Sequence, residues 1–169
     1  PRAYGKQTVE VEIGTAKGGY PRPREFTDVQ THPDRLDQPL RWKKPRRIFV
    51  NSMSDLFHEA IPDEFIDKVF AVMALAHQHK FQVLTKRPER MRTYLNASNP
   101  GVLSSIVVET ASFARINYVA TLSTWPLPNV HLGVSCEDQT TADERIPLLL
   151  KTPAAVRFIS YETALGPVN

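Results

Sequence analysis

The chain has 169 residues, of which 41% are hydrophobic and 23% are charged, with a formal net charge of +3. This composition is that of an ordinary globular domain, which excludes disorder over most of the length, and the charge alone does not argue for nucleic-acid binding. The one cysteine, Cys136, excludes an internal disulfide and a cysteine-based zinc or iron–sulfur site built by this sequence alone.

The first 25 residues are predicted to be a flexible N-terminal segment, because residues 14–25 are rich in glycine, proline and cations. The sequence starts without a methionine and stops at ALGPVN, so we expect a piece of a longer protein. No apolar run approaches the roughly 20 residues that span a bilayer, and no signal peptide is visible. We therefore expect no membrane partner, and the single cysteine fits a reducing, cytoplasmic location.

Residues 26–169 are predicted to form one domain in which strands and helices alternate. Short apolar runs bounded by turn residues predict strands, and apolar residues at helical spacing predict helices. The predicted strands are 25–32, 48–50, 81–85, 129–137 and 154–162. The predicted helices are a short one over 32–42, interrupted by Pro39, and three longer ones over 62–80, 88–98 and 138–152, the last with Asp138 as N-cap. Residues 102–128 fit either a short strand followed by a helix or a long insertion.

This alternation predicts an α/β fold with parallel strands, because the helix between two strands returns the chain to the edge where the next strand starts. The predicted strands are apolar runs without alternation, so we expect both faces of the sheet to be covered. The sequence contains no internal repeat. It also contains no GxGxxG, P-loop, HExxH or GxSxG motif.

Polar residues follow four of the predicted strands, at the point where each strand ends. The carboxyl ends of parallel strands lie at one edge of the sheet, which is where ligands bind in barrels and in open α/β sheets. We therefore predict a shared crevice in which Lys86 and Arg87 face carboxylates of other strand ends. The candidate residues are Ser52, Asp55, His58, Lys86, Arg87, Ser135, Glu137, Ser160 and Glu162.

Each of these residues also has a purely structural interpretation. Loops begin where strands end and are polar in any case. For Arg87, a salt bridge to Glu89 or Asp55 explains the residue as well as ligand binding does. For His58, a hydrogen bond that stabilises the loop is the better interpretation.

Other reactive or charged residues are expected to be structural. His77 and His79 are predicted to be cations at a helix terminus, and His131 to be packed in the core. Cys136 is predicted to be a small buried apolar residue. The run of Lys43, Lys44, Arg46 and Arg47 is expected to be a solvated face, with phosphate contact as the alternative.

Four long segments resemble a known family. These are residues 32–74, FQVLTKRPERM, residues 129–160 and the closing E-x-x-LGPV. They are similar to a family of phage and prophage proteins of unassigned function, which are themselves similar to radical-SAM enzymes and distantly to spore photoproduct lyase. The resemblance covers nearly all of residues 26–168 and implies a partial (βα) TIM-type barrel.

The resemblance also implies a cofactor that this sequence does not hold by itself. Typical members carry an N-terminal cysteine cluster that holds a [4Fe–4S] cluster for S-adenosylmethionine, and that motif is missing here. Thr163 also stands where a proline is expected after Glu162. We therefore expect no cofactor in this chain, and S-adenosylmethionine and [4Fe–4S] only in a full-length form.

The roles that follow from this resemblance and from strand position are expectations. A carboxylate accepts from an ammonium or a ribose hydroxyl, and a lysine holds a carboxylate or phosphate. The catalytic residues would be Glu137 and Glu162, and no residue is expected to bind a metal. Cofactor-binding residues would be Ser52, Lys86, Ser135 and Ser160, and substrate-binding residues would be Asp55, His58 and Arg87.

Three functions stay open at this point. The first is the core of a radical-SAM-like enzyme that acts on a nucleic acid or nucleotide. The second is a non-catalytic nucleotide- or DNA-binding module derived from a truncated barrel. The third is a hydrolase or lyase with Glu137 and Glu162 as an acid–base pair, which needs the two carboxyl groups within roughly 10 Å of each other. The sequence does not indicate an oligomeric state.

Overall fold

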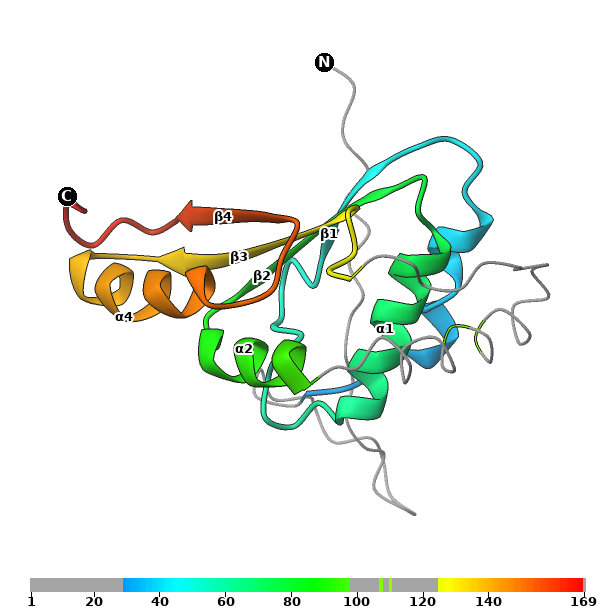
Figure 1. Cartoon of the computed structure of the whole chain (residues 1–169), viewed down its shortest axis with the longest axis horizontal. Helices are drawn as coiled ribbons and strands as arrows, with labels where there is room; N and C mark the ends of the chain where they lie inside the picture. The colour runs from blue at the N-terminus through cyan, green and yellow to red at the C-terminus, as the bar shows by residue number, and fades with distance from the viewer. Residues whose placement is uncertain (1–28, 98–106, 108–109, 111–124, 169) are drawn as a thin grey trace, which may run out of the picture.

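The structure, a computed structural model, describes residues 29–97, 107, 110 and 125–168 (Figure 1). The predicted N-terminal segment 1–25 and most of the ambiguous region 102–128 lie outside the described residues. The predicted strand 25–32 is described only from Val29 onward, and residues 29–32 form no strand. The domain predicted for residues 26–169 therefore stays a prediction over its full length.

Four parallel strands form one sheet, as the alternation of elements predicted. They are β1 (Arg47–Val50), β2 (Lys80–Thr85), β3 (Val130–Cys136) and β4 (Val156–Tyr161), and they lie in the order β1-β2-β3-β4. Three helices, α1 (Asp63–Leu75), α2 (Pro88–Ala97) and α4 (Gln139–Leu150), lie on one side of this sheet (Figure 1). The α/β class and the parallel pairing are thus confirmed.

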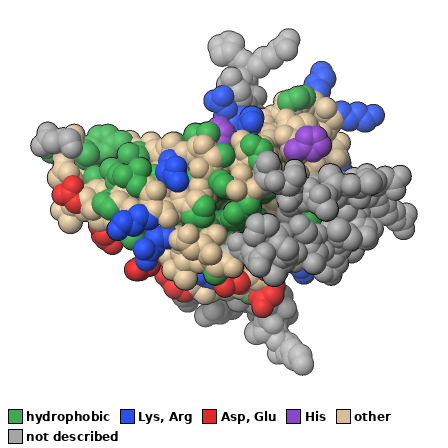
Figure 2. All heavy atoms as spheres, viewed as in Figure 1, with side chains coloured by type: hydrophobic (Ala, Val, Ile, Leu, Met, Phe, Trp, Pro, Cys, Tyr) green, Lys and Arg blue, Asp and Glu red, His purple; other side chains and the backbone are tan. Residues whose placement is uncertain are grey.

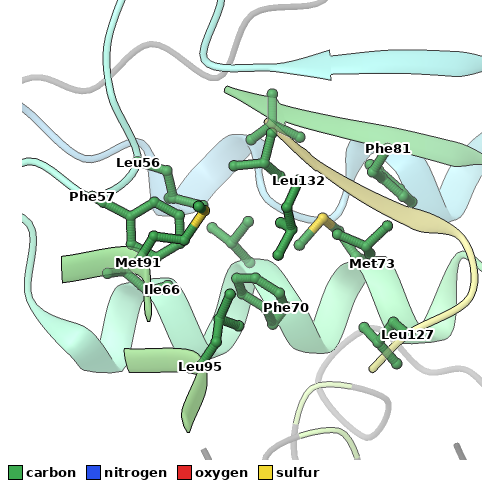
Figure 3. Close-up of a cluster of buried hydrophobic side chains, with 14 of the residues drawn as sticks. Leu56, Phe57, Ile66, Phe70, Met73, Phe81, Met91, Leu95, Leu127 and Leu132 are labelled. Carbon is green, nitrogen blue, oxygen red and sulfur yellow. The ribbon is translucent and has the colours of Figure 1, made fainter. Parts of the chain in front are cut away.

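The core lies between the sheet and these helices. Alternate strand residues such as Phe81 and Leu132 point toward α1 and α2, where they meet Phe70, Met73 and Leu95 (Figure 3). The residues between them on the strands point to the opposite face of the sheet. On β1 and β2 these residues, Phe49, Gln82 and Leu84, are half-buried.

The expectation that both faces of every strand are covered is wrong for β4. Its residues are exposed or half-buried throughout, and Val156, Ile159 and Tyr161 are exposed large apolar side chains. The physical reason is position, because β4 is the outer strand of the described sheet and pairs only with β3.

Helix boundaries agree with the capping signals except at the end of α1. Asp138 is the N-cap of α4, where its carboxylate accepts from the Thr141 N–H at 2.8 Å in a capping box, as predicted. The segment 32–42 forms two short 3₁₀ helices, Pro33–Arg35 and Gln38–Arg41, in place of one short helix.

Within the described residues, no helix is long and apolar enough to cross a membrane.

The prediction that His79 is a cation at a helix terminus is wrong. α1 ends at Leu75, because the next residue, Ala76, leaves the helical region with ψ of 44°. His79 lies beyond the helix and is fully buried. Its Nδ1 accepts from the Arg46 backbone N–H at 3.1 Å, and its Nε2 lies 2.9 Å from the Pro39 carbonyl oxygen. An accepting Nδ1 and a donating Nε2 describe a neutral imidazole.

Candidate functional site

At the carboxyl edge of the sheet, polar and charged side chains from three strand ends and from α4 lie together, and we call this group the rim. The rim consists of Asp55, Thr85, Lys86, Arg87, Glu137 and Arg145. The residues after β2 reach in two directions. Lys86 contacts Glu137, which follows β3, and Arg87 contacts Asp55, which follows β1. The two adjacent cations therefore connect their strand to both of its neighbours.

Asp55 is the acceptor on which the β1 side of the rim depends. Its carboxylate accepts from the Thr85 hydroxyl at 2.7 Å, from the Phe57 N–H at 2.9 Å and from the Lys86 N–H at 3.0 Å. The Arg87 guanidinium donates to it at 3.1 Å and also donates to Glu59 at 2.9 Å. A carboxylate with this many donors fixes the conformation of the loop from Asp55 to Phe57 and the end of β2 together.

Glu137 is held by two cations on the β3 side of the rim. Lys86 donates to Oε1, and Arg145, from α4, donates to Oε2 at 3.0 Å. Arg145 also donates to the Ser135 carbonyl oxygen at 2.8 Å. Burial raises the pKa of Glu137, but the hydrogen bond from Lys86 and the charges of Arg145 and Lys86 outweigh it, so the net pKa lies below its usual value. Glu137 is therefore ionised at neutral pH.

The two cations that pair with Glu137 differ in exposure. The Arg145 side chain is 14% exposed and the Lys86 side chain 57% exposed, against 11% for Glu137. Arg145 is thus part of the fold, whereas the Lys86 ammonium lies at the solvent boundary. A ligand anion that replaces Glu137 as the partner of Lys86 would leave Glu137 still paired with Arg145.

Ser135 differs from the rim residues because its hydroxyl is buried without a partner. The residue is 2% exposed, and its Oγ makes no hydrogen bond within the described structure. Ser135 is paired in register with Ser160 of β4, so both side chains point to the face of the sheet opposite the helices. Ser160 in turn donates to Glu162 at 2.5 Å.

On this same face, Phe158 lies across Gly133 of β3. A Cβ at Gly133 would lie 2.5 Å from the Phe158 ring, so the close approach of the ring to β3 requires glycine. The Phe158 ring is therefore part of the surface that surrounds the two serines.

The structure brings together four of the predicted site residues, Asp55, Lys86, Arg87 and Glu137, in the rim. The structural interpretation of Arg87 is confirmed for Asp55 as its partner. His58 lies in a turn, where its Nδ1 accepts from the Ala60 N–H at 3.2 Å, which fits the loop-stabilising interpretation. The remaining residues, Ser52, Ser135, Ser160 and Glu162, also follow or end the strands at the carboxyl edge, and Ser160 and Glu162 bond to each other. The catalytic, cofactor and substrate roles stay predictions.

Sequence reasoning missed Arg145, the more buried partner of Glu137. A signal was present, because Arg145 follows Glu137 by eight residues, about two turns into the helix that Asp138 caps, so its side chain can return toward the strand end. A cation at that spacing after a carboxylate at a strand end predicts an ion pair.

The residues present do not fit a [4Fe–4S] cluster. Cys136 is the one cysteine of the sequence and is buried, and burial is the main cause that raises the pKa of its thiol. In the part of the chain that the structure describes, no group of three or more His, Cys, Asp or Glu side chains is placed to hold a metal ion.

A protein-family model described as "Protein of unknown function (DUF5131)" matches residues 5–169. No curated protein matches the chain. No solved structure matches it either.

Proposed function

The chain belongs to this family of proteins of unknown function, and we propose that it is the ligand-binding core of a radical-SAM-like phage protein. In this proposal the sheet is part of a (βα) barrel, and the ligand is a nucleotide-type molecule bound at the carboxyl edge. S-adenosylmethionine is the ligand that the sequence resemblance suggests.

The strand order supports the barrel part of the proposal. The four described strands follow one another in sequence order without a reversal, and the described helices α1, α2 and α4 lie on one side. A doubly wound open sheet reverses its strand order at the ligand site, whereas a barrel does not. The face opposite the helices would then point to the barrel interior, with Ser135 and Ser160 at its carboxyl end.

The observation that carries the proposal is the unpartnered hydroxyl of Ser135. A buried polar group without a partner costs about 1–3 kcal/mol, and native structures contain few of them. This one lies at the carboxyl end of β3, the end where barrels and open α/β sheets bind ligands. A ligand hydroxyl or carboxylate that bonds to Ser135 Oγ would recover this cost.

The rim supplies the ionic contact for the same ligand. The exposed Lys86 ammonium exchanges Glu137 for a ligand carboxylate or phosphate, and Arg145 keeps Glu137 ionised and in place. Glu162, which is exposed and accepts from Ser160, is the carboxylate that remains for a ligand ammonium or ribose hydroxyl. The single cysteine of this chain does not supply the cluster that a radical step needs.

Isothermal titration of the full chain with S-adenosylmethionine, S-adenosylhomocysteine and AMP tests the proposal. We expect saturable binding, and we expect Ser135→Ala to weaken it about 3- to 10-fold, the worth of one hydrogen bond. Ser54→Ala is the matched control, since Ser54 is an exposed serine near the end of β1. Absence of binding to all three compounds, or equal losses in the two variants, would contradict the proposal.

A second candidate is a non-catalytic nucleotide-binding module, which the buried single cysteine favours. The iron and sulfide content of the purified full-length gene product separates the two candidates. A hydrolase or lyase with Glu137 as its acid is a weaker third candidate, because the pKa of Glu137 is lowered and two cations hold its carboxylate ionised.

A further inference from the structure

The amino edge of the sheet carries a group of cations that we call the amino-edge cluster. It consists of Lys43, Lys44, Arg46, Arg47 and Lys80, and all five residues are exposed. Arg47 and Lys80 are register partners at the first positions of β1 and β2. Within the described part of the chain, none of the five makes an ion pair with a carboxylate, in contrast to the cations of the rim.

Two cations of the cluster are held in place by the buried His79. Its ring accepts from the Arg46 N–H at 3.1 Å and contacts the Pro39 carbonyl at 2.9 Å, and the Lys80 N–H donates to the Arg46 carbonyl at 2.9 Å. The Arg46 guanidinium lies 4.5 Å from the centre of the Trp42 ring. These contacts join the backbone of the loop into β1 to the start of β2, so Arg46 and Lys80 lie side by side at the amino edge.

The positive field of this surface reaches the third strand. The pKa of His131 on β3 is lowered, first by burial and then by the charges of Lys80 and Arg47. Figure 2 shows Lys, Arg and His side chains at the top of the visible face, over the loop that leads into β1, with no Asp or Glu side chain among them. Unpaired cations without nearby carboxylates are the electrostatic footprint of a polyanion-binding surface.

We propose that the amino-edge cluster binds the phosphate backbone of a nucleic acid. An anionic membrane is the weaker alternative: Val156, at the first position of β4, lies at this edge but two strands away from β2, and none of the exposed large apolar side chains of the described residues belongs to the cluster. These are Met53, Leu150, Val156, Ile159, Tyr161, Leu165 and Val168. Trp42 is half-buried with Arg46 over its ring, and the five described residues of the cluster are all Lys or Arg, so the cluster itself offers no free ring for base stacking. Binding is therefore to phosphates and independent of base sequence.

This inference extends the proposed function, since it makes a nucleic acid the macromolecular partner. The cluster and the rim lie at opposite ends of strands of about six residues, roughly 20 Å apart at about 3.3 Å per residue. The cluster therefore anchors the nucleic acid, while the rim binds the small ligand. Each surface has its own probe, so failure of the nucleotide titration and failure of the duplex assay are separate results.

Fluorescence anisotropy of the full chain with labelled DNA and RNA duplexes of about 20 base pairs tests the inference. The slope of log K against log salt is about −0.9 per phosphate neutralised on B-DNA. We expect Lys43→Ala/Lys44→Ala to reduce the magnitude of the DNA slope by about 2 and to weaken binding at least about 10-fold at roughly 50 mM salt. Preference for the DNA or the RNA duplex identifies the natural polymer.

The matched control is Lys68→Ala/Arg92→Ala, which removes the same charge from α1 and α2. We expect its affinity to stay within about 3-fold of wild type with the slope unchanged. Equal effects of the two double variants would overturn the inference, because they would report net charge alone. Absence of duplex binding, or binding to vesicles of phosphatidylserine without duplex binding, would overturn it as well.

Discussion

Each edge of the sheet carries two adjacent cations, but only those at the carboxyl edge are paired with carboxylates. At the carboxyl edge, Lys86 and Arg87 are adjacent in sequence and both are paired with carboxylates. At the amino edge, Arg46 and Arg47 are also adjacent, and neither makes an ion pair within the described residues. The first arrangement joins strand ends into one unit, whereas the second leaves its charge for an external anion. Pairing with carboxylates, and not residue type, therefore distinguishes the cations of the two edges.

The largest effect on stability is expected when Asp55, the hydrogen-bond acceptor at the carboxyl edge, is removed. Asp55→Ala leaves Thr85, Arg87 and two backbone N–H groups without their partner. We expect the free energy of unfolding to fall by about 3–5 kcal/mol, the range for breaking a partly buried hydrogen-bonded ion pair. Denaturation in urea measures this loss.

Glu59→Ala provides the control, because Glu59 is an exposed second partner of Arg87. We expect no measurable change in its urea midpoint. Similar losses in the two variants would mean that Asp55 does not hold the rim together.

The next prediction concerns His79, the buried residue that bonds to the backbone of the amino edge. His79→Ala removes a ring that packs near Phe81 and Trp42, and it leaves the Arg46 N–H and the Pro39 carbonyl without their partner. We expect a loss of about 2–4 kcal/mol by urea denaturation, and weaker duplex binding in the anisotropy assay. His77→Ala, at an exposed position two residues earlier, should change neither. Unaltered duplex binding in a folded His79→Ala variant would show that the cluster does not depend on this support.

The pH dependence of stability gives a third, smaller test at the rim. The pKa of Glu137 is lowered in the folded chain, so its carboxylate stabilises the fold above the ordinary value of 4.5. This contribution is lost as the pH falls from 4.5 through the folded pKa. Glu137→Gln should therefore be less stable than wild type at pH 7, by about 1–3 kcal/mol, with a difference that shrinks below pH 4.5. A difference that is constant from pH 7 to pH 3 would show that packing, and not charge, explains the loss.

The sequence predicted the parts of this fold that local chemistry determines. Proline and acidic residues mark the start of α1, Asp138 caps α4, and apolar runs mark β2 and β3. The parallel topology then placed the polar strand ends at a common edge without any knowledge of contacts. These signals lie within one element or follow from the order of elements, so they can be read from a single sequence.

The pairing of charges could not be read in this way. Glu137 lies 51 residues from Lys86, and Asp55 lies 32 residues before Arg87. Arg87 was expected to pair with Glu89 or Asp55, and the local partner Glu89 instead lies 3.7 Å from Arg92. His79 was misread for the same reason, since its partners Pro39 and Arg46 are more than 30 residues away. Contacts between distant segments decide whether a polar residue is structural.

The smallest expected effect concerns Lys86, and it bears directly on ligand binding at the rim. Lys86 is mostly exposed, so its ion pair with Glu137 contributes little, and Lys86→Ala should cost less than about 1 kcal/mol by urea denaturation. Arg145→Ala should cost more, about 2–3 kcal/mol, because the Arg145 side chain is only 14% exposed and also bonds the Ser135 carbonyl. A cation that contributes little to the fold can change partner when an anion arrives. If instead Lys86→Ala is as destabilising as Arg145→Ala, Lys86 is a structural cation and the exchange of Glu137 for a ligand anion is ruled out.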